Sequence, residues 1–234
     1  MKVGAIQSCF IPWRGYFDFI ASVDMFVFYD DVQYSKNGWR NRNKIKTPTG
    51  VQWLTVPVQH IRLDQLVSEI CVGNSIDWRK KHYGSWQANY SRSTYYKDVM
   101  ELLSNLWEPK EITISKINIE LAKRICQYLG ISTQLILSSD LSLSGTKTAR
   151  LIDLLKKLGA STYLSGASAD VYLDKEAFRA NGIRLEYKSY DYDPYPQLWG
   201  PFEGAVTVLD LIANCGPQSK ERIRSTAPDR IIIP

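Results

Sequence analysis

The hydrophobic pattern near the N-terminus switches between strand-like and helix-like periods. Residues 2–6 form a short apolar segment that is typical of a buried strand, and residues 15–22 place their large apolar side chains on one side, as a helix does. Residues 25–29 are an uninterrupted apolar run, which predicts a second buried strand. A strand, a helix and a strand in so short a stretch predict a βαβ unit with parallel strands.

The same alternation returns in the second half of the chain. The expected elements are strands at residues 133–137, 162–165 and 183–187 and helices at residues 146–158, 175–180 and 206–214. Strand–helix alternation at both ends of a chain predicts an α/β fold, here with a Rossmann-like parallel sheet as its core.

A hairpin is expected between the first strands and the middle of the chain. Residues 51–58 alternate apolar and polar side chains and follow a turn-forming segment at residues 47–50. Pro57 places this strand at an edge or close to its own end.

Residues 75–129 have a helical period throughout and predict a helical insertion lobe. One expected helical face carries Trp78, His82 and Trp86, and Ser75 is the expected cap. A second amphipathic helix ends at Gly130, which favours a helix stop. The whole chain, residues 1–234, is interpreted as a single α/β domain with this lobe inside it.

Composition narrows the class of protein. The chain has 234 residues, of which 44% are hydrophobic and 23% charged, as in a soluble globular protein. No apolar run has the length of a membrane span, and the N-terminus lacks the pattern of a secretory signal. We therefore expect a cytoplasmic protein with reduced cysteines. The two histidines and four cysteines are scattered and do not cluster as metal ligands do, so we expect no metal site.

A polar and aromatic cluster follows the second expected strand. The net charge of +5 suits an anionic small ligand better than a polynucleotide. Arginine forks and a lysine in the cluster fit phosphate or carboxylate oxygens, and its aromatic rings could stack on a sugar or a base. The alternative is a solvated basic loop. The candidate binding residues here are Gln33, Tyr34, Trp39, Arg40, Asn41, Arg42 and Lys44.

Proton transfer has three candidates. Asp30 and Asp31 end the second expected strand, where parallel sheets place ligands at their carboxyl edge. Neighbours on an extended chain face opposite sides, so one aspartate is expected in the site and the other as a cap or as a partner of Arg40 or Arg42. His82 is the better of the two histidines for proton transfer, although packing is its alternative role.

A small-residue loop follows the strand at residues 162–165. Ser165 and Gly166 permit close backbone approach to a ligand, and Tyr172 lies shortly after them. Phosphate-binding and hydrolase motifs of known spacing do not occur. Cys9 follows the first strand and could be a nucleophile, but the apolar residues after it favour packing.

These segments resemble the WbqC-like family of bacterial surface-polysaccharide proteins. The resemblance rests on Gln7, Pro12, the Gly15-Tyr16-Phe17 run, Asp24, residues 29–34 and 39–43, Lys81-His82, Tyr90, Ser138-Ser139, residues 163–166, Tyr172-Leu173, Tyr195, Gln197, Phe202 and residues 209–216. It extends over essentially the whole chain.

The resemblance implies a cytoplasmic enzyme of O-antigen (lipopolysaccharide) biosynthesis. It would transfer an aminoacyl group, such as glycyl, or another acyl group to the amine of a nucleotide-linked amino sugar. The donor would be an aminoacyl-tRNA or ATP plus an amino acid, with no tightly bound cofactor. Gln7 and Gly15 join the candidate substrate-binding residues, and Gln7 would contact sugar hydroxyls or the amine.

Two other functions stay open at this level. One is an ATP-dependent nucleotidylyl transferase or ligase, although residues 12–18 lack the histidine motif that such enzymes carry after their first strand. The other is an aminoacyl-tRNA-binding protein whose basic cluster grips RNA phosphates.

Overall fold

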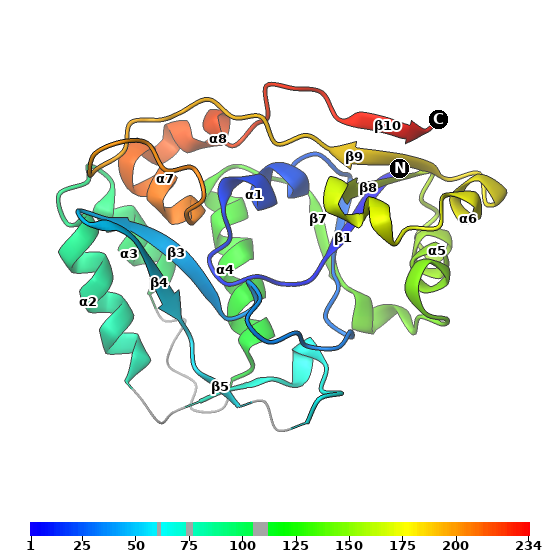
Figure 1. Cartoon of the computed structure of the whole chain (residues 1–234), viewed down its shortest axis with the longest axis horizontal. Helices are drawn as coiled ribbons and strands as arrows, with labels where there is room; N and C mark the ends of the chain where they lie inside the picture. The colour runs from blue at the N-terminus through cyan, green and yellow to red at the C-terminus, as the bar shows by residue number, and fades with distance from the viewer. Residues whose placement is uncertain (60–61, 74–76, 105–111) are drawn as a thin grey trace.

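The core of the computed structural model is a mixed sheet in the order β10-β9-β8-β1-β2-β7 (Figure 1). The structure describes residues 1–59, 62–73, 77–104 and 112–234. The sheet strands are β1 (Lys2–Ile6), β2 (Met25–Phe28), β7 (Gln134–Leu137), β8 (Thr162–Gly166), β9 (Arg184–Lys188) and β10 (Arg230–Ile233). All neighbouring pairs are parallel except β9 and β10. The expected α/β class and the expected strands are confirmed, and β10 is an antiparallel edge that the pattern did not predict.

Both faces of the central strands are buried, which explains why β1 and β2 are apolar runs, whereas β9 alternates polar and apolar residues. Phe26, Phe28 and Leu164 lie in one core with helices α1 (Arg14–Ile20), α4 (Ile114–Tyr128) and α7 (Val208–Cys215). Val3, Val27 and Tyr163 lie in a second core with α5 (Lys147–Lys157) and α6 (Lys175–Ala180). The carboxyl ends of the parallel strands therefore open between two layers of helices.

A separate hairpin, β3 (Arg42–Thr47) and β4 (Gly50–Thr55), stands beside the sheet (Figure 1). The turn lies where the sequence placed it, and Pro57 follows the end of β4. The expected hairpin is present, and its first strand begins inside the basic cluster: the residues pair from Arg42 opposite Thr55 to Thr47 opposite Gly50. Basic residues mask the alternation of this strand, since its inward positions are Asn43 and Ile45.

The helical middle of the chain contains α2 (Trp78–Tyr90) and α3 (Tyr96–Leu103) before α4. The predicted aromatic face of α2 is confirmed, because Trp78, His82 and Trp86 are all buried. The expected cap Ser75 lies outside the described residues; the α2 cap is Asp77, whose Oδ1 accepts from the Lys80 amide at 3.1 Å. The remaining short elements are β5 (Val58–Gln59), β6 (Cys71–Val72), α8 (Ser219–Arg222) and 3-10 turns at Val67–Glu69, Ser138–Leu141, Ala167–Val171 and Gly216–Gln218.

The segment before α7 is tied to the hairpin by a buried polar network. Lys46 Nζ donates to Gln197 Oε1 at 2.7 Å, and Gln197 Nε2 donates to Asp210 Oδ1 at 2.6 Å. Tyr90 donates its hydroxyl to Asp210 Oδ2 at 2.6 Å, and burial raises the pKa of this carboxyl. Each buried polar group thereby has a partner, so β3, α2 and α7 are held in one arrangement.

Across the part of the chain that the structure describes, helices are too short or too polar to cross a membrane.

Candidate functional site

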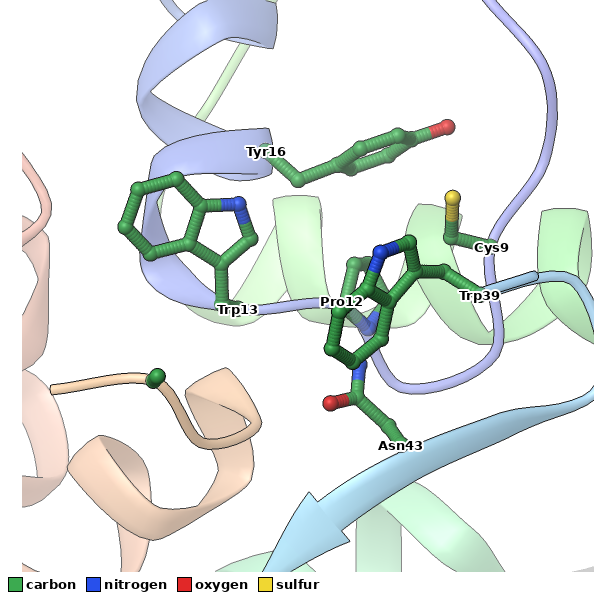
Figure 2. Close-up of a pocket in the computed structure, with 7 residues that line it drawn as sticks. Cys9, Pro12, Trp13, Tyr16, Trp39 and Asn43 are labelled. Atoms are coloured by element: carbon green, nitrogen blue, oxygen red, sulfur yellow. The ribbon is translucent and has the colours of Figure 1, made fainter. Parts of the chain in front are cut away.

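A pocket of about 360 Å³ lies beside the loop that joins β1 to α1 (Figure 2). Figure 2 shows the thiol of Cys9 pointing toward the hydroxyl end of Tyr16, with the ring of Trp39 drawn between Cys9 and Trp13. The lining of the pocket combines aromatic rings with one thiol and one amide. It consists of Cys9, Pro12, Trp13, Tyr16, Trp39, Asn43 and Ala205. Ligand pockets are commonly apolar and aromatic with a few polar groups that orient the ligand.

The walls of this pocket are fixed by hydrogen bonds between the β1–α1 loop and the start of the hairpin. Asn43 Nδ2 donates to the carbonyls of Phe10 and Ile11 at 3.1 and 2.9 Å. The Phe10 amide donates to the Trp39 carbonyl at 2.9 Å. Segments far apart in sequence are thus joined, and both contribute to the lining.

Gly15 gives the Trp13 ring its place in the wall. A Cβ at Gly15 would lie 2.4 Å from Trp13 Cζ2, closer than non-bonded atoms approach. The candidate binding role of Gly15 therefore has a structural basis: the absence of a side chain lets the indole fold over the first turn of α1 and reach the pocket.

Arg40 contacts the thiol of Cys9, with Arg40 Nη1 2.6 Å from Cys9 Sγ. Burial raises the pKa of Cys9, and the nearby guanidinium lowers it by a smaller amount. Burial also raises the pKa of Tyr16 well above its usual value. Both groups are therefore protonated at neutral pH and act as hydrogen-bond donors.

The other cations of the cluster lie on β3. The guanidinium carbon of Arg42 is 4.6 Å from the centre of the Trp53 ring, and Lys44 Nζ is 5.2 Å from it. Trp39 and Trp53 contact each other with ring centres 5.3 Å apart. Within the described residues, Arg40, Arg42 and Lys44 form no ion pair with a carboxylate, whereas Arg150 and Lys188 do. The cluster thus carries positive charge that no described acidic side chain neutralises.

Asp30 and Asp31 lie at the carboxyl ends of β2 and β7, away from the pocket lining. Asp30 is buried, and its carboxylate accepts from Ser138 Oγ, the Ser139 amide and Ser139 Oγ at 3.0 to 3.1 Å. Asp31 accepts from Ser138 Oγ at 2.5 Å and pairs with Arg150 of α5. The expected partners Arg40 and Arg42 are therefore wrong for Asp31, because the loop after β2 turns toward α5 rather than toward the hairpin.

His82 is buried on the inner face of α2. Its Nε2 donates to the Thr55 carbonyl at 3.0 Å, which fixes the neutral tautomer with the proton on Nε2. Burial lowers its pKa to about 4. Its ring contacts Phe10 and Trp78, with ring centres 5.7 and 5.1 Å away. His82 supports the loop behind the pocket and does not line the pocket itself.

Three further candidates form hydrogen bonds within the protein. Gln33 Nε2 donates to the Leu63 carbonyl at 2.6 Å, and Tyr34 donates its hydroxyl to Asn41 Oδ1 at 3.2 Å. Asn41 Nδ2 donates to the Val56 carbonyl at 2.8 Å. These residues shape the base of the hairpin, outside the pocket lining.

Gln7 lies at the end of β1, next to the pocket. The hydroxyl of Tyr16 donates to the Gln7 carbonyl at 3.2 Å. Among the described residues, the buried atom Gln7 Oε1 has no hydrogen-bond donor. Because this atom has no exposed surface, a ligand reaches it only when the Gln7 side chain turns toward the pocket.

Ser165 and Gly166 end β8, the neighbour of β1 in the sheet. Ser165 is buried, whereas Tyr172 lies on the surface with 68% of its area exposed. A Cβ at Gly166 would lie 3.9 Å from the Tyr190 hydroxyl, and the Tyr190 ring is 5.3 Å from that of Trp13. Gly166 thus lies near Tyr190, which contacts Trp13 of the pocket wall, whereas Ser165 and Tyr172 are outside the pocket lining.

The sequence reasoning assigned Trp39 to a site but left out most of the other lining residues. Cys9, Trp13, Tyr16 and Asn43 were visible as polar or aromatic side chains immediately after a strand or inside the basic cluster. For Cys9, Trp13 and Tyr16, the position after the first strand at the carboxyl edge of the sheet was the signal that could have found them. In the described part of the chain, His, Cys, Asp and Glu side chains do not gather in a group of three that could hold a metal ion.

Comparison with known proteins gives a family and one relative. The family model described as "WbqC-like protein family" matches residues 7–222, so the expected resemblance is confirmed. The chain is 44% identical over 226 residues to Uncharacterized protein Rv1507c of Mycobacterium tuberculosis (strain ATCC 25618 / H37Rv), an alignment that spans 95% of this chain and 97% of the relative. No solved structure matches the chain.

Proposed function

Because this chain belongs to the WbqC-like protein family, we propose that it is a transferase that moves an aminoacyl group, such as glycyl, or another acyl group onto the amine of a nucleotide-linked amino sugar. The observation that carries the proposal is an aromatic pocket of about 360 Å³ next to three cations without a described carboxylate partner. A sugar suits the pocket, and a diphosphate suits the cations.

The pocket offers the contacts that a sugar ring needs. The faces of Trp13 and Trp39 can cover the apolar C–H side of the ring. The unpaired Gln7 Oε1 can accept from a hydroxyl or an ammonium group once its buried side chain turns to face the pocket. Binding at this edge of the sheet also fits the position at which α/β sheets hold their ligands.

Acyl transfer requires stabilisation of negative charge on the acyl oxygen as the amine attacks. Arg40 is the cation that contacts the pocket lining, through Cys9, and its guanidinium is suited to this task. The Cys9 thiol and the Tyr16 hydroxyl already donate to the Gln7 carbonyl, so they hold the wall of the pocket in place. Asp31 lies away from this pocket and pairs with Arg150, so we assign it no part in removing the ammonium proton, and Asp31→Asn is expected to retain activity.

Four free cysteines fit a reducing compartment, and we place the reaction in the cytoplasm, in surface-polysaccharide (O-antigen) biosynthesis. The acyl group must arrive in activated form, as an aminoacyl-tRNA or after activation of the amino acid by ATP.

The test is a mass measurement on the acceptor. Purified protein is incubated with nucleotide-linked 3-amino and 4-amino sugars and with glycine plus ATP or with glycyl-tRNA. The proposal expects one acceptor to gain a glycyl or acyl mass, and Trp39→Ala to reduce the rate about tenfold or more because one stacking face is lost. Tyr83→Ala, which removes an exposed ring of α2 outside the pocket, serves as the control. No mass gain on any acceptor with folded protein would contradict the proposal.

A second candidate, nucleotidylyl transfer, is favoured by the strand order. When the six sheet strands are numbered in chain order and read across the sheet from β7 to β10, their order is 3-2-1-4-5-6. This is the order of doubly wound, Rossmann-like nucleotide-binding folds, and we propose that the core is of this type. This candidate predicts release of pyrophosphate from a nucleoside triphosphate when an acceptor is added. Acyl gain on the sugar without pyrophosphate release, using a preformed aminoacyl donor, would remove it.

A further inference from the structure

The outer face of the β3–β4 hairpin carries an exposed aromatic platform. Trp39 and Trp53 have 46% and 42% of their areas exposed, and their rings are in contact. Two neighbouring exposed indoles leave a large apolar area in contact with water, and such patches often mark binding sites. Stacking on a base would cover such a platform and contributes about 1–3 kcal/mol per base.

Two cations lie against this platform. Arg42 and Lys44 occupy alternate positions of β3, so their side chains lie on the same face of the hairpin. Trp53 is directly opposite Lys44 on β4, and its side chain lies on that face too. The Nε atom of Arg42 is buried and has no hydrogen-bond partner among the described residues. Two positive charges next to stacking rings match a ligand that joins a base to a diphosphate.

The platform is continuous with the pocket. Trp39 lines the pocket and also contacts Trp53, so it belongs to both surfaces. A ligand whose sugar occupies the pocket could therefore pass Trp39 and continue along the outer face of the hairpin. The order of groups along that path is pocket, Trp39, and then Trp53 with its cations.

The loop after β1 does not offer an alternative place for phosphates. Doubly wound folds bind phosphates with a glycine-rich turn before the first helix, but residues 7–14 contain no glycine. Phe10 and Ile11 are buried there, and their carbonyls accept from Asn43. Side-chain cations outside the sheet must then take over the role of the turn.

We propose that Trp39, Trp53, Arg42 and Lys44 form a nucleotide subsite, in which the base stacks on the indoles and the two cations bind the diphosphate. The inference rests on the proposed function, since it assigns the sugar of the same ligand to the pocket. In this arrangement the hairpin binds the nucleoside diphosphate part of the ligand, and the pocket binds its sugar.

The subsite is tested by binding of nucleoside diphosphates without any sugar or acyl donor. UDP, GDP, CDP, dTDP and ADP are titrated into the full chain, with calorimetry and tryptophan fluorescence as readouts. At least one is expected to bind with quenching of the indole emission. Trp53→Ala should weaken that binding about tenfold or more, and Trp53→Phe should retain most of it.

The cations have matched controls. Arg42→Ala and Lys44→Ala should each weaken binding and make it less dependent on salt, because each removes one contact to the diphosphate. Arg92→Ala and Lys116→Ala remove exposed charges from the described surface elsewhere and should bind as the wild type does. Circular dichroism verifies the fold of each variant. If a variant does not fold, the titration of the wild-type protein still tests the subsite.

Three results would overturn the subsite. The first is a wild-type protein that binds none of the five diphosphates, and the second is a folded Trp53→Ala variant that binds them unchanged. The third is retention of single-stranded RNA without binding of any nucleoside diphosphate, which would assign the platform to a polynucleotide. Binding of a diphosphate without acyl transfer would support the subsite while the proposed function fails.

Discussion

Arg40 Nη1 lies 2.6 Å from Cys9 Sγ, so a cation from the basic cluster and a thiol from the β1–α1 loop meet at the pocket. The guanidinium lowers the pKa of the thiol, against the larger raising effect of burial. Removing it in Arg40→Ala should therefore move the pKa of Cys9 further up. The midpoint of the pH profile for alkylation of Cys9, followed by peptide mass mapping, is expected to shift to higher pH.

Cys71 is an internal control for this experiment, since it is exposed and its alkylation should not change. Cys9 should react more slowly than Cys71 in the wild type, because it is buried and its pKa is raised. An unchanged or lowered midpoint at Cys9 in Arg40→Ala would show that the contact has no electrostatic effect.

His82 makes the stability of the protein sensitive to mild acid. Its pKa falls from 6.5 in the unfolded chain to about 4 in the fold, so protonation favours unfolding. The stabilising effect is complete above pH 6.5 and is lost as the pH falls to about 4, with a loss on the order of 3 kcal/mol.

The comparison variant is His82→Gln, whose amide can still donate to the Thr55 carbonyl but does not titrate. Denaturant unfolding followed by circular dichroism across this pH range should show a smaller loss in the variant than in the wild type. Equal losses in both proteins would mean that His82 is not the group responsible.

Gly15→Ala should impair the pocket without unfolding the protein. The new methyl group would displace the Trp13 ring from the wall, because its Cβ would lie 2.4 Å from the indole. Binding of a nucleotide-linked amino sugar should weaken about tenfold through loss of one stacking contact, as measured by calorimetry. Gly84→Ala is the control: a Cβ at this position in α2 would point into open space, so the variant should leave binding unchanged and stabilise the fold by up to about 1 kcal/mol.

Asp30 is predicted to matter for stability. Its carboxylate accepts from the Ser139 amide and Ser139 Oγ and shares the Ser138 hydroxyl proton with Asp31, which joins the ends of β2 and β7. In Asp30→Asn one carboxylate oxygen becomes an NH₂ group, which cannot accept from the serine donors. The free energy of unfolding should therefore fall by about 2 kcal/mol. Asp140→Asn, at an exposed neighbouring position, should have almost no effect. Equal stability of the two variants would contradict the structural role of Asp30.

The sheet was predictable from the sequence because buried parallel strands are continuous apolar runs. Met25–Phe28 and Gln134–Leu137 were recognised on that basis, and their helices followed from period and stop signals. The extent of Arg42–Thr47 was not recognised, since its charged residues hide the buried positions of Asn43 and Ile45. Arg230–Ile233 was missed because it is a short edge strand at the end of the chain.

The site was predictable only in part. Trp39 and Arg40 were identified by composition, and both reach the pocket region. The tertiary contact between Asn43 and the carbonyls of Phe10 and Ile11, which brings the hairpin against the β1–α1 loop, has no local signal in the sequence. The ion pair of Asp31 with Arg150 likewise depends on the path of a loop across more than a hundred residues.

The most direct test of this account is a crystal structure of the protein with a nucleotide-linked amino sugar bound. The account predicts the sugar in the pocket between Trp13 and Trp39, with the diphosphate on Arg42 and Lys44. A sugar bound instead at Asp31 and Arg150, with the pocket empty, would contradict it.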